Sequence, residues 1–378
     1  MKELLNAFID GDLQTPPLCT AATKGSVGLV TMLLDKFGAD KDFKGTDGDT
    51  PLIGATDKGH LPVVEALLAG GAGVNIPGSS ESTALHVAAM KGYDGIAGAL
   101  LDSGAEKDAC DDTGGTPLMD AAYHGHLPVV KTLLAARADT LLARRADVNI
   151  VACDGSTALI KAAQEGHEGI VDALLDAGAE KDSVDKYGKS PLIAASNLCN
   201  LPVVKTLMAA RVDVNILDSD ADQNMGTESP LMAAVSHDHL PVVETLLAAG
   251  ADTTILSTGV VTATALHCAA ANSRVAHVNL LLRWGADEKA LSGGGRTPAD
   301  MSVSNAVCLL LARAPVDRAW RRRGWLVMLR SRTLKDKDCG GDGRDEEARS
   351  AKRQCGSFDL VAVVPTLGEG VFRNIVGF

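Results

Sequence analysis

A segment similar to Thr-Pro-Leu returns along the chain at a nearly constant interval, and this period constrains the fold more than any other feature. The gaps between successive starts are 34, 33, 33, 41, 33, 39, 35 and 33 residues. Such a period is typical of proteins that stack copies of one small unit, because a single unit cannot bury its apolar face alone. The first to ninth repeats start at Pro16, Thr50, Thr83, Thr116, Thr157, Ser190, Ser229, Thr264 and Thr297.

Each repeat is predicted to form two short antiparallel helices followed by a loop. In the second repeat, Thr50 is a good N-cap and Pro51 suits the first helical position. Gly59 is expected to end the first helix, and a Leu-Pro-Val-Val segment opens the second. Gly71-Ala72 closes that helix, and a polar stretch with Asp and Gly turns the chain back.

These units resemble ankyrin repeats, whose pattern is TPLHxAAxxGHxxVVxLLLxxGADVN. The resemblance covers about residues 15–312 and recurs in register nine times. It implies an all-α repeat solenoid of helix-turn-helix units with short hairpin loops in a mildly curved stack. It also implies a non-catalytic scaffold or adaptor that binds a protein partner along the concave groove and needs no cofactor.

The chain departs from this pattern in two places and adds a second period. The fourth residue of the pattern, a histidine, survives as His86 and His267, so apolar packing should replace its bonds elsewhere. The glycine after the first helix is lost at Cys199, Asp238 and Ser273, so the sixth to eighth repeats are expected to be the least regular. The first, third and fifth repeats end in Lys-Asp, and the second, fourth and sixth end in Val-Asn, which indicates duplication of a two-repeat block.

Five segments are predicted from the repeat boundaries and the composition. Residues 1–14 read as a capping helix, 15–314 as the repeat array, 315–332 as a basic amphipathic helix, 333–357 as a disordered linker and 358–378 as an apolar segment. The fourth gap of 41 residues contains a tandem octet within residues 133–148, which either lengthens a helix or bulges out and bends the stack.

The charge of the array is acidic and argues against nucleic acid as its partner. The formal net charge of the chain is −12, and the first 312 residues have a formal net charge of about −17. Aromatic residues make up 3% of the chain, which is low for the core of a globular enzyme. The eight cysteines are scattered singly, as expected in a reducing compartment, so a cytoplasmic location is expected, with the nucleus as the alternative. No secretory signal or membrane span is expected, and the chain is predicted to be a monomer.

Metal binding and catalysis find little support in the sequence. The pairs His124/His126 and His237/His239 would need further ligands, and His126 and His239 occupy the Gly-His position of the repeat, as His60 and His167 do. Cys339 and Cys355 have no nearby histidine for a zinc site. No metal site and no catalytic residue are therefore predicted.

The resemblance implies that the partner contacts two residues before the glycine of each repeat and residues at the loop tips. Tyr123 and Tyr187 are the expected anchors, because tyrosine is enriched at the centres of interfaces. The predicted set is Thr46, Asp47, Asp57, Lys58, Met90, Lys91, Asp112, Thr113, Tyr123, His124, Cys153, Asp154, Gln164, Glu165, Lys186, Tyr187, Asn197, Leu198, Ser236 and His237.

Two other functions remain open at this stage. Arg321, Arg322 and Arg323 in the tail would suit a weak contact with an anionic membrane, a nucleic acid or an import receptor. An enzyme would need its chemistry within residues 315–378, which are too few to bury a proper active site.

Overall fold

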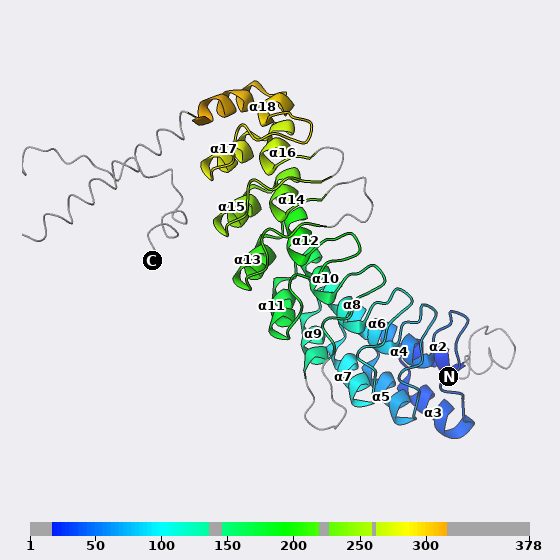
Figure 1. Ribbon diagram of the computed structural model, residues 1–378. Coiled ribbons are helices and arrows are strands. Elements are labelled where there is room, and N and C mark those ends of the chain that lie inside the picture. The colour runs from blue at the N-terminus through cyan, green and yellow to red at the C-terminus, as the bar shows by residue number, and fades with distance from the viewer. Residues whose placement is uncertain (1–16, 136–145, 219–226, 259–261, 316–378) are drawn as a thin grey trace, which may run out of the picture. The chain divides into compact units, whose positions relative to one another are not determined.

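The computed structural model describes residues 17–135, 146–218, 227–258 and 262–315 (Figure 1). Within these residues the regular elements are helices, and they come in pairs. The first and second helices of successive repeats are α2 (Pro17–Thr23) and α3 (Val27–Phe37), α4 (Pro51–Asp57) and α5 (Leu61–Ala69), α6 (Ala84–Lys91) and α7 (Asp94–Asp102), α8 (Pro117–Tyr123) and α9 (Leu127–Leu134), α10 (Ala158–Glu165) and α11 (Glu168–Asp176), α12 (Pro191–Asn197) and α13 (Leu201–Ala209), α14 (Pro230–Ser236) and α15 (Leu240–Ala248), and α16 (Ala265–Ala271) and α17 (Val275–Arg283). The short helix α18 (Pro298–Met301) follows, and residues 305–315 are also helical.

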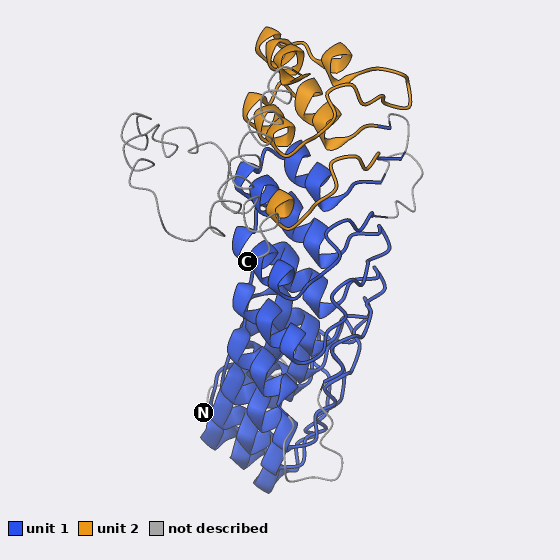
Figure 2. Cartoon of the chain, turned by 60° about the vertical axis from the view of Figure 1, so that its left-hand side comes forward, with its two compact units in different colours: residues 1–245, 257–262 blue, residues 246–256, 263–378 orange. Residues whose placement is uncertain are grey.

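The chain divides into two compact units (Figure 2). The first comprises Met1–Thr245 with Ser257–Thr262, and the second comprises Leu246–Leu256 with Ala263–Phe378. In the first compact unit, first helices pack on the first helices of neighbouring repeats, and second helices pack on second helices. The loops extend beyond the first helices (Figure 1), and we call this side the loop face.

The predicted start of each described repeat is a helix N-terminus. The hydroxyl oxygens of Thr50, Thr116 and Ser190 accept a hydrogen bond from the backbone N–H three residues on, at 3.3 Å in each case. In the first to eighth repeats the leucine of the start is buried, and so are small alanines of the first helix. Capping therefore fixes where each first helix begins, and burial of its apolar face against neighbouring repeats stabilises it.

Apolar side chains fill most places where the pattern has its first histidine, as expected. Ile53, Met119 and Ile160 are buried at this position. Where the histidine survives, its imidazole connects two repeats: the Thr83 N–H donates to Nδ1 of His86 at 3.1 Å, and Nε2 lies 3.2 Å from the Gly115 carbonyl of the next repeat. Burial lowers the pKa of His86, which favours the neutral ring that this arrangement requires.

The second histidine of the pattern also joins adjacent repeats. Nε2 of His126 lies 3.0 Å from the Met90 carbonyl, and Nε2 of His167 lies 3.1 Å from the Tyr123 carbonyl. His60 and His239 make the same contact. The structural interpretation of His126 and His239 is thus confirmed: each satisfies a carbonyl at the C-terminal end of the preceding first helix.

The turn after the first helix keeps its left-handed backbone even where glycine is lost. Gly59 and Gly125 have φ of 72° and 81°, and Cys199, Asp238 and Ser273 have φ of 61°, 67° and 56°. The second helices that follow begin at equivalent places. The expected irregularity of the sixth to eighth repeats is therefore wrong at these turns, where three residues with a Cβ adopt a conformation that favours glycine.

At the edge formed by the C-terminal ends of the second helices, hydrogen bonds explain the two-repeat period. Nζ of Lys41 donates to the Gly70 carbonyl at 3.0 Å, and Oδ1 of Asp42 accepts from the Gly73 N–H at 2.8 Å. In the next repeat, Asn75 alone bonds both a carbonyl and an N–H of the following repeat. Lys107 with Asp108, Asn149, and Lys181 with Asp182 continue the alternation. We call this series the edge ladder.

Asn75 offers a direct test of the edge ladder. Its Nδ2 donates to the Gly104 carbonyl at 3.2 Å, and its Oδ1 accepts from the Glu106 N–H at 2.9 Å. We expect Asn75→Ala to lower the free energy of unfolding by about 1–2 kcal/mol, because two hydrogen bonds are lost. Asn75→Asp keeps the acceptor and should lose about half as much. Urea denaturation of the full chain measures both, and an unchanged midpoint for Asn75→Ala would contradict the role of the ladder.

The second helix of the fourth repeat does not continue through the octet insertion. The helix α9 ends at Leu134, Ala135 is extended, and the N–H of Ala146 bonds the Leu133 carbonyl at 3.3 Å. The chain therefore leaves the repeat after Ala135 and returns beside the same helix end.

Several predicted segments lie outside the described residues. They are the capping helix 1–14, residues 136–145 of the octet, the basic segment from residue 316 with Arg321, Arg322 and Arg323, the linker 333–357 with Cys339 and Cys355, and the apolar segment 358–378. The division of the chain into these segments stays a prediction.

Candidate functional site

A hollow of about 630 Å³ opens on the loop face of the first compact unit. It is formed by the first helices α8 and α10 of the fourth and fifth repeats and by the loops before α8, α10 and α12. Its lining residues are Thr113, Gly115, Met119, Asp120, Tyr123, Ala152, Cys153, Asp154, Lys161, Gln164 and Lys186.

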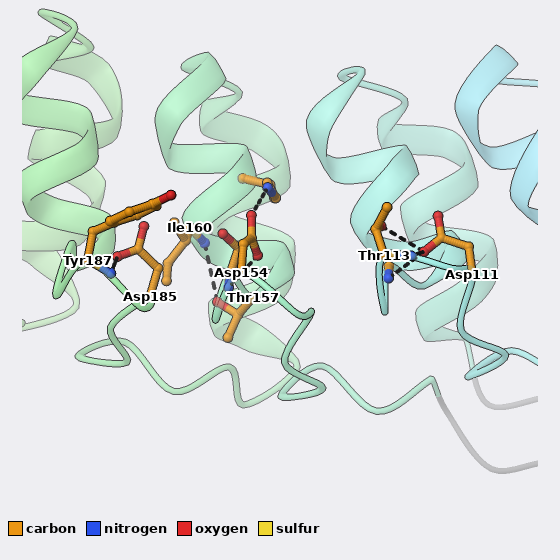
Figure 3. Close-up of polar contacts among 10 residues, drawn as sticks. Asp111, Thr113, Asp154, Thr157, Ile160, Asp185 and Tyr187 are labelled. Atoms are coloured by element: carbon orange, nitrogen blue, oxygen red, sulfur yellow. Dashed lines mark hydrogen bonds and ion pairs between the residues drawn. The ribbon is translucent and has the colours of Figure 1, made fainter. Parts of the chain in front are cut away.

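The loop tips around the hollow are shaped by aspartates that bond their own backbone. Oδ1 of Asp111 accepts from the Thr113 N–H at 2.9 Å, and Oδ1 of Asp185 accepts from the Tyr187 N–H at 2.9 Å (Figure 3). Oδ1 of Asp154 accepts from the Ser156 N–H at the same distance. Such turns hold the tips in one conformation without help from a partner.

Successive tips are also bonded to one another. The Cys153 N–H donates to the Thr113 carbonyl at 2.9 Å, and the Lys186 N–H donates to the Asp154 carbonyl at 3.0 Å. Gly155 makes this approach possible, because its φ is 78° and a Cβ there would collide with the backbone N of Lys186. The wall of the hollow is therefore a row of loops joined by backbone hydrogen bonds.

One ion pair lies inside the hollow. Nζ of Lys161 is 2.8 Å from Oδ2 of Asp154. Partial burial raises the pKa of Asp154, but the hydrogen bonds from Lys161 and Ser156 outweigh it, so the pKa lies below its ordinary value. The Asp154 carboxyl is therefore ionised at neutral pH and pairs with Nζ of Lys161.

Asp120 is the unusual residue of the hollow. Its side chain is half-buried, and its buried Oδ2 has no hydrogen-bond partner among the described residues. Burial, reinforced by the negative charge of Asp111, raises the pKa of the Asp120 carboxyl to about 7. A carboxyl in this environment is half ionised at neutral pH and would gain from a cation brought to it.

Two tyrosines flank this region and remain accessible. Tyr123 is 43% exposed and Tyr187 is 46% exposed, so a partner can contact both rings. The ring of Tyr123 meets that of His124 edge-on with centroids 5.0 Å apart, and Nζ of Lys186 lies 4.8 Å from the centroid of Tyr187. Exposed rings held by neighbours lose little conformational entropy on binding.

The structure brings together part of the predicted partner-binding set. The residues of this set that line the hollow are Thr113, Tyr123, Cys153, Asp154, Gln164 and Lys186. Tyr187 and His124 lie next to lining residues in the sequence. Asp112 donates its N–H to the Ser80 carbonyl at 3.3 Å, as part of the contact between neighbouring loops.

The remaining predicted residues lie outside the hollow. Asp57 forms ion pairs with Lys58 at 2.9 Å and with Lys91 at 3.3 Å, all at exposed positions of low energetic value. The other members are Thr46, Asp47, Met90, Glu165, Asn197, Leu198, Ser236 and His237, which lie in the first loop or at the C-terminal ends of first helices.

The sequence analysis missed the two charged residues that project from the first helices into the hollow. Asp120 and Lys161 occupy the position four residues after the repeat start. Other repeats carry small or apolar residues at this position: Gly54, Val87, Ala194, Ala233 and Cys268. A charge where its counterparts are uncharged was the signal that a column-by-column comparison would have found.

The described parts of the chain contain neither a metal-binding cluster nor a membrane-spanning helix. Among those residues no group of three or more His, Cys, Asp or Glu side chains could hold a metal ion. No helix within the same ranges has the length and apolar character needed to cross a membrane. The described cysteines Cys19, Cys110, Cys153, Cys199, Cys268 and Cys308 are free thiols.

Comparison with known proteins identifies the repeated unit. A family model described as ankyrin repeats, in three copies, matches residues 1–78, 71–141, 138–218 and 216–292. Together these matches span most of the chain. A search of the curated proteins found no match.

Proposed function

Because the chain belongs to the ankyrin repeat family, whose members are generally protein-binding modules and typically not enzymes, we propose that its loop face holds a protein partner. In this proposal the chain is a non-catalytic adaptor, and the free thiols of its described cysteines support a reducing compartment such as the cytoplasm. The partner would lie across the first helices and the loop tips of the fourth to sixth repeats.

The hollow beside α8 and α10 is the observation that carries this proposal. Its volume of about 630 Å³ is within the range of pockets that receive a ligand group. Aspartate turns and backbone bonds between Thr113, Cys153 and neighbouring tips hold its wall rigid. A rigid surface with exposed aromatic rings at its edge costs little to order when a partner binds.

We expect the double variant Tyr123→Ala/Tyr187→Ala to weaken partner capture by about tenfold or more, as loss of aromatic anchors does. Partners are captured by the intact chain from a cell extract, identified by mass spectrometry, and compared between wild type and variant. Both rings are substantially exposed, so the array should stay folded.

Phe37→Ala is the matched control for this experiment. Phe37 is 61% exposed and is the last residue of α3, a second helix. Its ring therefore lies outside the part of the loop face that carries Tyr123 and Tyr187. Its removal should leave capture unchanged. Equal capture by wild type and the double tyrosine variant would contradict binding through this part of the loop face.

A further inference from the structure

The hollow contains an acidic group that the fold does not need. Helix α8 begins at Pro117 after the Thr116 cap, whose hydroxyl oxygen accepts from the Met119 N–H at 3.3 Å. Asp120 is the next residue, so it takes no part in this cap. The corresponding residues in the sixth and seventh repeats, Ala194 and Ala233, are buried in equivalent helices. A carboxyl is therefore dispensable for folding at this position.

The positive charges that line the hollow already have partners other than Asp120. Lys161 pairs with Asp154 at 2.8 Å, and Nζ of Lys186 lies over the ring of Tyr187 at 4.8 Å. The charge that acts on the pKa of Asp120 is that of Asp111, and it is negative. A buried carboxylate oxygen in such surroundings is costly until a donor reaches it.

The charge of the array and the size of the hollow both favour a cationic side chain as ligand. The first 312 residues carry about −17 of formal charge, so a basic segment is attracted to the array as a whole. The hollow of about 630 Å³ can take a long side chain, and the accessible ring of Tyr123 on its lining can receive a cation on its face. An acidic or purely apolar side chain would leave Asp120 unpaired.

We propose that this hollow receives a lysine or arginine side chain from a peptide segment of the partner, whose ammonium or guanidinium group donates a hydrogen bond to the Asp120 carboxylate beside Tyr123. This inference rests on the proposed function and specifies the chemistry of the partner. The stem of the basic side chain packs against Met119 and Tyr123, and the charged end pairs with Asp120. The contact is charge-assisted, and it gives the Asp120 carboxylate a cationic partner.

Selection from a displayed library of random peptides tests this assignment on the full chain. Wild type should select peptides in which a lysine or arginine recurs at one position, and Asp120→Asn should lose that preference. The selected peptide should bind Asp120→Asn about tenfold or more weakly, and its analogue with norleucine or citrulline at the basic position should bind wild type equally weakly. Asp176→Asn removes one exposed acid from the end of α11 and is the matched control, which should behave as wild type.

A second measurement observes Asp120 itself. Carbon-13 NMR of the aspartate carboxyls should show that the basic peptide lowers the apparent pKa of Asp120, because a nearby cation favours the ionised form. The norleucine analogue should leave this pKa unchanged. An unchanged pKa with the basic peptide bound would overturn the assignment.

The outcomes separate this inference from the proposed function. Peptides without a recurrent basic residue that still require Tyr123 and Tyr187 would overturn the inference and leave the binding surface standing. Equal affinity of wild type and Asp120→Asn for a basic peptide would do the same. Failure of wild type to select any peptide would overturn both.

Discussion

Gly125→Ala should destabilise the array by about 3 kcal/mol, whereas Gly104→Ala should cost only about 1 kcal/mol. Both glycines have positive φ, 81° and 89°, so both substitutions strain the backbone. A Cβ at Gly104 would meet nothing within 4 Å, but a Cβ at Gly125 would lie 2.6 Å from Cε1 of His167. The imidazole would have to move and give up its contact with the Tyr123 carbonyl, which costs about 1 kcal/mol more, with the lost packing in addition.

Urea denaturation of the two variants measures the difference, and a third substitution tests its cause. His167→Ala removes the ring that collides, so Gly125→Ala should cost much less in that background. This coupling is read from a double-mutant cycle. Equal losses for Gly125→Ala and Gly104→Ala would show that backbone strain alone explains the glycine, and that the approach of His167 is unimportant.

Asp120→Ala should stabilise the protein above pH 7 and have little effect near pH 4. The folded-state pKa of Asp120 is about 7, against an ordinary value of 3.8, so the folded chain holds this proton more tightly than the unfolded chain does. The contribution of Asp120 to stability therefore falls as pH rises from about 4 to 7 and stays low above 7. A shift of this size corresponds to about 2–4 kcal/mol at most.

The stability difference between wild type and Asp120→Ala, measured at several pH values, isolates this group. His86 and His267 work in the opposite direction, because burial lowers the pKa of each, so their stabilisation is lost as pH falls below about 6.5. They are common to both proteins and cancel in the difference. A gain from Asp120→Ala that is the same at pH 5 and pH 8.5, within about half a kcal/mol, would refute the raised pKa.

A residue that lowers stability and lines a hollow is what a binding site is expected to contain. Ala194 and Ala233 show that the same helix position accepts a small apolar side chain elsewhere in the array. The strain of an unpaired carboxyl at Asp120 is relieved when a ligand supplies its donor. Stabilisation by Asp120→Ala, together with loss of binding by Asp120→Asn, would document this trade-off in one residue.

The helices and their ends were predictable from sequence because they depend on local chemistry that each repeat restates. Thr50 and Gly59, for example, fix the two ends of α4 by a cap and a left-handed turn. Nine copies of the pattern made those assignments secure against variation in any one of them. At Cys199 the left-handed turn persists although glycine is lost, with φ of 61°.

The site was only partly predictable, because it depends on differences between repeats. The pattern placed Thr113, Tyr123 and Lys186 on one face, but it treated every repeat alike. The position of the hollow depends on the side chains that meet at α8 and α10. It also depends on how closely the neighbouring loops approach one another. Asp120 was missed because the repeat pattern assigns its position no role in binding, and Ala194 and Ala233 are buried there in other repeats.

The edge ladder has a consequence for how such a chain can change its length. Each of its side chains, whether Lys41 with Asp42 or Asn75, ends on a main-chain atom of the following repeat. These hydrogen bonds do not depend on the side chains of the following repeat. Either the Lys-Asp pair or the asparagine can therefore precede any repeat of the array. Recombination that inserts or deletes a module carrying the edge ladder can therefore preserve these hydrogen bonds at the new junctions.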